Sequence, residues 1–335
     1  MKKGILDIID SALKQGIKQS KACALIQIDE RRIQRWRVRG DQLEDSLPGP
    51  LKAPHALLDE EKEAIREFAL DAKYVDDSHR VLAAKGTDKS LFFVSASSVY
   101  KVMLENDLTA DRSGRSHKNG RSTAPERHEI DGPNQRWCWD ITYCHTRVKG
   151  VFVYLYTILD EYSRKVIAWR ISWYMNHKEA MELIQEGLEK ENLTDIDIKL
   201  PDLINDRGTQ MKAKAFMKMC KNLGIDQKFA RPRTPNDNPF IESLFSIVKG
   251  YHLYPGIFID DIEAIIYFTE FFNYYNTARY HGKIGFVTPA QKHLGLDEII
   301  IKRRKERLID ARKTRLQKNR NTKLLTKLDN NLVKV

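Results

Sequence analysis

The feature that most constrains the fold is a run of strict alternation that begins at Trp137. In the stretch WCWDITY, large apolar side chains occupy every second position, and smaller or polar side chains fill the positions between them. This period of two predicts a β-strand that carries Asp140 on the face opposite to Trp139 and Tyr143. The stretches VFVYLYTILD and KVIAWRIS follow at short distances and are rich in β-branched and aromatic residues. Together they predict an antiparallel meander of three strands.

Beyond the meander, helical and extended patterns alternate. The segment HKEAMELIQEGLEKEN has apolar residues at helical spacing, and PDLIND and IDQKFA are typical of short strands with a further helix between them. The last helix follows the basic loop RPRTPND and carries Glu242. The order β-β-β-α-β-α-β-α predicts an α/β fold of the α+β type, in which helices pack on a mixed sheet.

The first 48 residues are predicted to form a helix-turn-helix that binds DNA. Asp29 can cap the helix ERRIQRWRVR, in which Ile33 and Trp36 would pack inward. The basic residues on the outer side are the candidates for contacts in the major groove: Arg31, Arg32 and Arg35. A plain three-helix bundle has the same pattern and is the alternative.

The boundaries of the other predicted domains follow from changes in amino-acid composition along the chain. Residues 49–108 repeat the helical pattern, as a second helix-turn-helix-like domain or as a helical spacer. Residues 109–127 are rich in Ser, Gly and Arg and are expected to form a basic linker along a DNA backbone. Residues 128–295 contain the strands. Residues 296–335 are predicted to form a basic helical tail, because positions 301–335 carry thirteen Lys and Arg against three Asp and Glu, nearly all of the net charge of +11. Such a tail binds polyanions or is simply solvated.

Cysteine spacing and hydropathy indicate the cellular compartment in which the protein is expected. The four cysteines show neither a CxxC pair nor zinc-finger spacing, so we expect buried free thiols and a reducing compartment. No stretch of about 18 uncharged apolar residues occurs. The beginning MKKGILDIIDSALKQG has no apolar core typical of a secretory signal. We therefore expect a soluble, cytoplasmic protein with no membrane partner.

Three carboxylates lie where the predicted sheet would bring them together. Asp140 lies in the middle of the first strand, Asp206 ends the fourth, and Glu242 begins the helix after the fifth. Each alone would be taken for a surface or capping residue. Gathered at one sheet edge, they would repel one another unless a cation compensated, and oxygen-only ligands favour Mg²⁺ or Mn²⁺. We predict a site for two such ions, about 3.5–4 Å apart, suited to phosphodiester chemistry.

The motifs around these acids resemble those of a known superfamily. Between Asp140 and Asp206 lie 65 residues, and between Asp206 and Glu242 lie 35. This spacing is similar to the DDE triad of transposases and retroviral integrases. WCWDITY, LDEYSRKVIAW, NDRGTQ, NDNPFIESLFSIVK and NYYNTARYHGKIGFVTPAQ match successive motifs of the bacterial transposases of insertion sequence family three. The resemblance covers about residues 128–295 and implies an RNase H-like catalytic core, a bacterial origin and a place at the nucleoid.

The resemblance also implies roles for individual residues. Asp140, Asp206 and Glu242 would be the catalytic metal ligands, and Lys249 would contact the DNA end. Asn238 would position the substrate or cap the helix. Arg231 and Arg233 belong to the basic loop and would lie beside a phosphate path. Asp160 and Ser163 match the family pattern, with turn stabilisation as their expected role.

The implied function is that of a DNA transposase. It would bind double-stranded DNA at the terminal inverted repeats, hydrolyse phosphodiesters to expose 3′ hydroxyls, and join these to target DNA by two-metal transesterification. Two ends must be held together, so a homo-oligomer, at least a dimer, is expected on DNA. A structure-directed nuclease on the same fold and a transposase-derived DNA-binding regulator are the alternatives.

Overall fold

The computed structural model describes residues 2–40, 53–74, 76–109, 129–195, 198–205, 211–229 and 238–332. The chain divides into two compact units, Met1–Ala56 and Leu57–Val335. Each unit has a hydrophobic core of its own. Within the ranges just given, no helix combines the length and the apolar character that a membrane span requires.

The first unit consists of short helices around a small core. Its helices are α1 (Lys2–Lys14), α2 (Gln19–Leu25) and α3 (Glu30–Arg39). Ile33 and Trp36 of α3 are buried in this core, as their spacing predicts. The Asp29 side chain accepts a hydrogen bond from the Arg31 backbone N at 2.7 Å and so caps α3. The three candidate arginines on the other face are exposed: Arg31, Arg32 and Arg35.

The second unit begins with a group of helices: α4 (Asp59–Leu70), the 3₁₀ turn η1 (Ala72–Tyr74), α5 (His79–Asp88) and α6 (Ala96–Glu105). Ile65, Phe68 and Val99 belong to the hydrophobic cluster that these helices share. Ser95 caps α6, since its hydroxyl accepts a hydrogen bond from the Ser98 backbone N at 3.2 Å.

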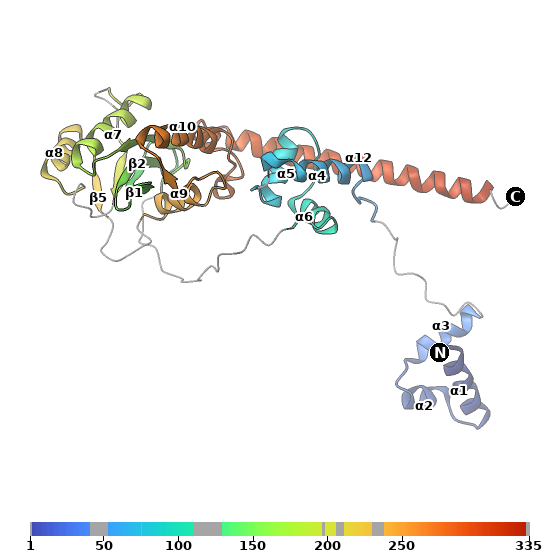
Figure 1. Ribbon diagram of the computed structural model, residues 1–335. Helices are drawn as coiled ribbons and strands as arrows, with labels where there is room; N and C mark the ends of the chain where they lie inside the picture. Colours follow the sequence, from blue (N-terminus) through green and yellow to red (C-terminus); the bar gives the residue numbers. More distant parts are fainter. Residues whose placement is uncertain are drawn as a thin grey trace. The chain divides into compact units, whose positions relative to one another are not determined.

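The second unit contains a mixed sheet (Figure 1). Its strands are β1 (Arg136–Thr146), β2 (Phe152–Asp160), β3 (Val166–Ser172), β4 (Asp202–Asn205), β5 (Gln227–Phe229) and β6 (Ile257–Phe258). The spatial order is β3-β2-β1-β4-β5, and β6 pairs with the far end of β1. β1, β2 and β3 form the predicted antiparallel meander, whereas β4 and β5 run parallel to β1.

Helices cover both faces of this sheet. They are α7 (His177–Lys190), α8 (Lys214–Leu223), α9 (Pro239–Lys249) and α10 (Asp261–Thr277). An antiparallel meander followed by two parallel strands, with helices on both faces, is the RNase H-like arrangement. The predicted α/β fold class with an RNase H-like core is therefore confirmed.

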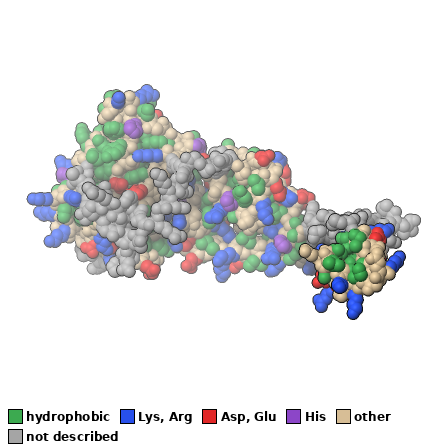
Figure 2. Space-filling view, turned by 90° about the horizontal axis from the view of Figure 1, so that it is seen from below, with side chains coloured by type: hydrophobic (Ala, Val, Ile, Leu, Met, Phe, Trp, Pro, Cys, Tyr) green, Lys and Arg blue, Asp and Glu red, His purple; other side chains and the backbone are tan. Residues whose placement is uncertain are grey.

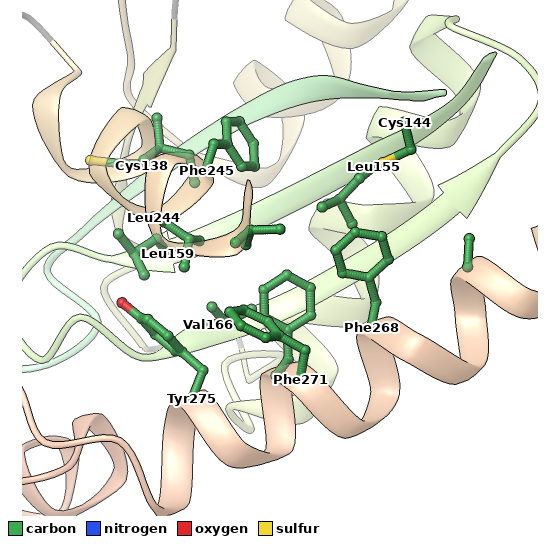
Figure 3. Close-up of a cluster of buried hydrophobic side chains, with 14 of the residues drawn as sticks. Cys138, Cys144, Leu155, Leu159, Val166, Leu244, Phe245, Phe268, Phe271 and Tyr275 are labelled. Atoms are coloured by element: carbon green, nitrogen blue, oxygen red, sulfur yellow. The ribbon is translucent and has the colours of Figure 1, made fainter. Parts of the chain in front are cut away.

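The alternation along β1 separates two hydrophobic cores. Trp137 and Trp139 are buried against residues of α7 and α8. Cys138 and Cys144, which point the other way, are buried against α9 and α10. Figure 3 shows aromatic side chains of α10, among them Phe268, directed at the strands of this second core. Asp140 thus lies on the face of β1 that α9 covers.

The chain continues through the turn η3 (Gly282–Ile284), the short helix α11 (Pro289–His293) and the long helix α12 (Asp297–Leu332). Basic side chains of α12 bind groups of the α4–α6 region. Arg304 forms a bidentate pair with Asp88, with N···O distances of 2.8 and 2.6 Å. Arg315 Nε donates to Glu61 Oε1 at 3.1 Å. Part of the positive charge of the tail is therefore compensated within the chain.

Candidate active site

Asp140 lies in the middle of β1 and is partly exposed. Its Oδ1 accepts a hydrogen bond from the backbone N of Ile141 at 2.8 Å. β4 pairs with β1 only as far as Cys138, and β6 pairs with it only from His145 onward. Between these points, on the side of β4, β1 has no partner among the described strands. Asp140 is thus placed at an open part of the sheet.

Helix α9 lies along this part of β1 and is attached to it at both ends. Asn238, just before the helix, donates from Nδ2 to the Trp139 carbonyl oxygen at 3.4 Å. At the other end, Lys249 Nζ donates to Thr142 Oγ1 at 2.8 Å. Between them, the apolar side of α9 packs into the core through Ile241, Leu244, Phe245 and Val248. The helix therefore runs in the same direction as the strand.

This attachment determines where Glu242 lies. Glu242 is in the first turn of α9, and Lys249, seven residues later, lies on the same side of the helix. Because Lys249 reaches Thr142, that side of α9 faces the face of β1 that carries Asp140. Glu242 is exposed, yet partial desolvation raises the pKa of its carboxyl group. A nearby cation would reverse that shift.

Several predicted residues lie outside the described ranges: Asp206, Arg231 and Arg233. Strand β4 is described up to Asn205, and Cys138 of β1 pairs with Ile204 of β4. Among the described residues, which do not include Asp206, no three or more His, Cys, Asp and Glu side chains form a group that could hold a metal ion. The structure thus brings together the strand and the helix that carry Asp140, Glu242, Asn238 and Lys249. Arg31, Arg32 and Arg35 belong to the separate first unit.

The chemistry of the nearby side chains favours oxygen ligands. Cys138 and Cys144 share the face of β1 with Asp140, but both are fully buried. Burial raises the pKa of the Cys144 thiol to about 11, so it is neutral at physiological pH. Apart from these thiols, the ionisable groups of α9 and of this face of β1 between Cys138 and Cys144 are Asp140, Glu242 and Lys249. Hard divalent cations prefer such oxygen ligands.

A second polar cluster lies at the turn between β2 and β3. The sequence pointed to only some of its residues. Ser163 Oγ donates to Asp160 Oδ2 at 2.6 Å and lies 3.0 Å from His293 Nδ1. His293 Nε2 lies 2.7 Å from Glu191 Oε2, and Lys165 Nζ donates to Glu191 Oε1 at 2.6 Å. This buried clamp ties α11 and the end of α7 to the β2–β3 turn. Its Ser163 hydroxyl is fully buried and closed to substrate.

Sequence patterns pointed to Asp160 and Ser163, but not to their partners. Glu191 follows an ordinary amphipathic helix, and His293 ends a short one. Burial alone would raise the pKa of Glu191, but hydrogen bonds from His293, Asn134 and Lys165 lower it to about 2. Burial would lower the pKa of His293, whereas Asp160 and Glu191 raise it. Only the folded arrangement shows these contacts.

Two family models match part of the second unit. Residues 131–235 match the family model described as "Integrase core domain", and residues 223–289 match a second model with the same description. The sheet and α9 lie within these ranges. Residues 131–289, less than half of the chain, are therefore similar to integrase core domains.

The relatives of the chain are insertion-sequence transposases. The chain is 28% identical over 160 residues to the transposase for insertion sequence element IS904 of Lactococcus lactis subsp. lactis (strain IL1403), covering 47% of this chain and 60% of the relative. It is 26% identical over 159 residues to the putative transposase InsK for insertion sequence element IS150 of Escherichia coli (strain K12), covering 48% and 54%. The matches thus span little more than half the length of these relatives. The resemblance to the DDE transposases of insertion sequence family three, with their integrase core, is confirmed.

Solved structures that align with part of the chain include retroviral integrases. The integrase catalytic core domain of HTLV-2, in complex with magnesium, aligns with 49% of this chain and 99% of its own, at 15% identity and a TM-score of 0.37. The catalytic core domain of BIV integrase aligns with 50% and 97%, at 19% identity and a TM-score of 0.37.

Proposed function

We propose that the protein is a metal-dependent DNA transposase. It would bind the terminal inverted repeats of its element, cut phosphodiesters to expose 3′ hydroxyls and join these to target DNA. The observation that carries the proposal is the attachment of α9 along β1, which brings Glu242 to the face of Asp140 inside an integrase core domain.

Asp140, Asp206 and Glu242 would be the ligands of Mg²⁺ or Mn²⁺. The parallel register supports the inclusion of Asp206: Cys138 pairs with Ile204, and Asp140 and Asp206 each follow two residues later. A continuation of that register would put the two aspartates opposite each other. A pair of bound ions would supply Lewis-acid stabilisation of the charge that develops at the scissile phosphate.

The other residues would hold the DNA. Lys249, now bonded to Thr142, could turn its ammonium group to a phosphate near the site. Asn238 fixes the start of α9 and so the position of Glu242. Arg231 and Arg233 would contact the DNA backbone. Arg31, Arg32 and Arg35 would read the terminal repeats from α3. Because two DNA ends must be joined at once, the active complex would be at least a homodimer.

The test is a cutting and joining assay. The protein is incubated with Mg²⁺, labelled element ends and a supercoiled plasmid. Asp140→Asn, Asp206→Asn and Glu242→Gln should each lower product formation by on the order of a thousandfold or more, as expected for residues that act as one unit. Glu189→Gln is the matched control, because Glu189 is an exposed acid on α7.

Three outcomes would contradict parts of the proposal. Unchanged activity in Asp206→Asn would remove Asp206 from the site. Cut ends without joined product, under varied conditions, would identify a nuclease. Binding of the ends without any Mg²⁺-dependent cutting would identify a DNA-binding regulator.

A further inference from the structure

The meander carries an aromatic surface on the face opposite to Asp140. Along β1, burial decreases steadily on this face: Trp139 is fully buried, Ile141 is partly buried, and Tyr143 is 54% exposed. The side chain of His145, the next in this row, is also exposed. The alternation placed Tyr143 on the same face as Trp139, but α7 and α8 cover only the first part of it.

Rings from two strands meet there. Tyr143 lies opposite Tyr154, and His145 lies opposite Phe152, in the β1–β2 register. The Tyr143 ring centroid is 6.0 Å from that of Tyr154 and 5.9 Å from that of Phe152, and His145 lies 5.2 Å from Phe152. These four residues, Tyr143, His145, Phe152 and Tyr154, are called the aromatic platform below.

The connection from β3 to α7 borders the platform with more exposed apolar groups. Tyr174 is 68% exposed and Trp173 is 39% exposed. The connection is held in place because the Tyr156 hydroxyl donates to the Tyr174 carbonyl oxygen at 2.8 Å and accepts from the Asn176 backbone N at 3.0 Å. The exposed rings therefore stand on a rigid support. Exposed apolar groups gathered in this way mark an interaction surface.

The charge around the platform favours a polyanion as the partner. Residues 141–159, the part of the β1–β2 hairpin between Asp140 and Asp160, contain no Asp or Glu but include His145, Arg147 and Lys149. Residues 162–178, which include β3 and its connection to α7, also contain no Asp or Glu, and the acids that follow on α7, Glu179, Glu182 and Glu186, are paired with Arg170 of β3. Over the one face of the molecule that Figure 2 shows, Lys and Arg side chains lie among hydrophobic ones. A partner with flat apolar rings and negative charge fits such a surface, and a DNA strand with unpaired bases has both.

We propose that the aromatic platform, on the face of the sheet opposite to Asp140, stacks unpaired bases of a DNA strand that passes from the active site around the open side of β1. Tyr143 follows Asp140 by three residues on the same strand, which is about 10 Å along β1. No described strand pairs with that side of β1 between Cys138 and His145, so a DNA strand opened near the scissile phosphate could pass around it and rest a base on the platform. This inference rests on the proposed function, because it assumes that DNA is bound at Asp140. It adds the prediction that the protein prefers DNA with unpaired bases at the reacting end.

The test measures stacking directly and needs no chemistry. The full-length protein is titrated, without divalent metal, into a short oligothymidine strand that contains one 2-aminopurine, whose fluorescence falls when the base stacks on a ring. Tyr143→Phe keeps the ring, whereas Tyr143→Leu keeps apolar bulk and loses the ring. Wild type and Tyr143→Phe should quench the fluorescence, and Tyr143→Leu should bind about tenfold more weakly with little quenching. Leu253→Ala, at an apolar side chain that is 63% exposed, is the control for loss of exposed apolar surface and should behave as wild type.

Other outcomes would overturn the proposal. Equal quenching by wild type and Tyr143→Leu would exclude the ring as a stacking partner. A changed sedimentation coefficient of Tyr143→Leu, with unchanged quenching, would make this face a contact between protein chains instead. The proposed function is tested separately by Mg²⁺-dependent cutting of duplex ends. If the wild-type protein stacks the base but does not cut duplex ends, the proposed transposase function is refuted and the platform stands. If it cuts duplex ends but base stacking does not depend on the Tyr143 ring, only the platform is refuted.

Discussion

Glu191→Gln is expected to weaken the buried clamp without disturbing the shape of the side chain. The Glu191 carboxylate faces His293 Nε2 at 2.7 Å, Lys165 Nζ at 2.6 Å and Asn134 Nδ2 at 2.9 Å. The side chain is only 8% exposed, so water hardly competes for these bonds. A neutral amide would keep the volume but leave two cationic or potentially cationic partners without their counterion.

The size of the effect follows from the pKa. A fall in the pKa of Glu191 from 4.5 to about 2 corresponds to about 3 kcal/mol of stabilisation of the ionised form in the folded protein. Hydrogen bonds to charged groups contribute about 1.5–3 kcal/mol each, which gives the same scale. We therefore expect Glu191→Gln to lower the free energy of unfolding by about 2–3 kcal/mol at pH 7.

The pH dependence has a definite sign. Since folding lowers the pKa of Glu191 from 4.5 to about 2, its contribution is complete above pH 4.5 and is lost as the pH falls toward 2. The difference between wild type and Glu191→Gln should shrink over that range. His293 has a raised pKa, so its contribution is complete below 6.5 and is lost as the pH rises through the higher value of the folded protein.

The measurement is urea-induced unfolding followed by tryptophan fluorescence. Trp137 is a reporter of this region, because its Nε1 donates to Asn134 Oδ1 at 3.0 Å. Glu189→Gln is the matched control, two residues away on an exposed part of the helix, where substitutions change stability by about 0.5 kcal/mol or less. If both variants unfold with the same free energy at pH 7, the reasoning about the clamp is refuted.

Three further perturbations test other parts of the chain. Gly86→Ala should lower the free energy of unfolding of the α4–α6 region by about 1–3 kcal/mol, because an added Cβ would collide with the Phe92 ring. An unchanged midpoint of thermal unfolding would contradict that packing. Lys249→Met should weaken binding of duplex ends and reduce the slope of log affinity against log salt concentration by about 1, as measured by fluorescence anisotropy; an unchanged slope would exclude a phosphate contact. Arg304→Met should remove the bidentate pair with Asp88, lower stability by about 1–2 kcal/mol and speed amide exchange in α5, and equal exchange rates would show that this pair does not hold α12.

Much of the sheet and of its covering helices could be predicted from local patterns. The alternation around Trp137 predicted β1 and the face that carries Asp140, because side chains of a strand point to alternate sides whatever the strand packs against. Asp29 predicted the start of α3, because a cap needs only its neighbouring backbone N–H groups. Spacing within motifs pointed to Glu242 and Lys249, because a helix repeats its faces regularly.

Contacts between distant segments could not be predicted in this way. No local pattern shows that His293 reaches Glu191, because the two residues are brought together only by the packing of α11 on the meander. Exposure of Tyr143 was missed for a related reason: the alternation gives the face, but the extent of helix cover depends on where α7 and α8 pack.

The amino-acid sequence by itself determined the kinds of elements, the residues on each face, and the acids that motif spacing singled out. The tertiary structure decided that α9 lies along β1, that the tail arginines pair with Asp88 and Glu61, and that the end of the meander keeps its rings exposed. The physical reason is the distance along the chain over which each interaction acts. Strand alternation and helix periodicity arise from bonds between near neighbours, whereas burial and ion pairing depend on which distant segments fill the same space.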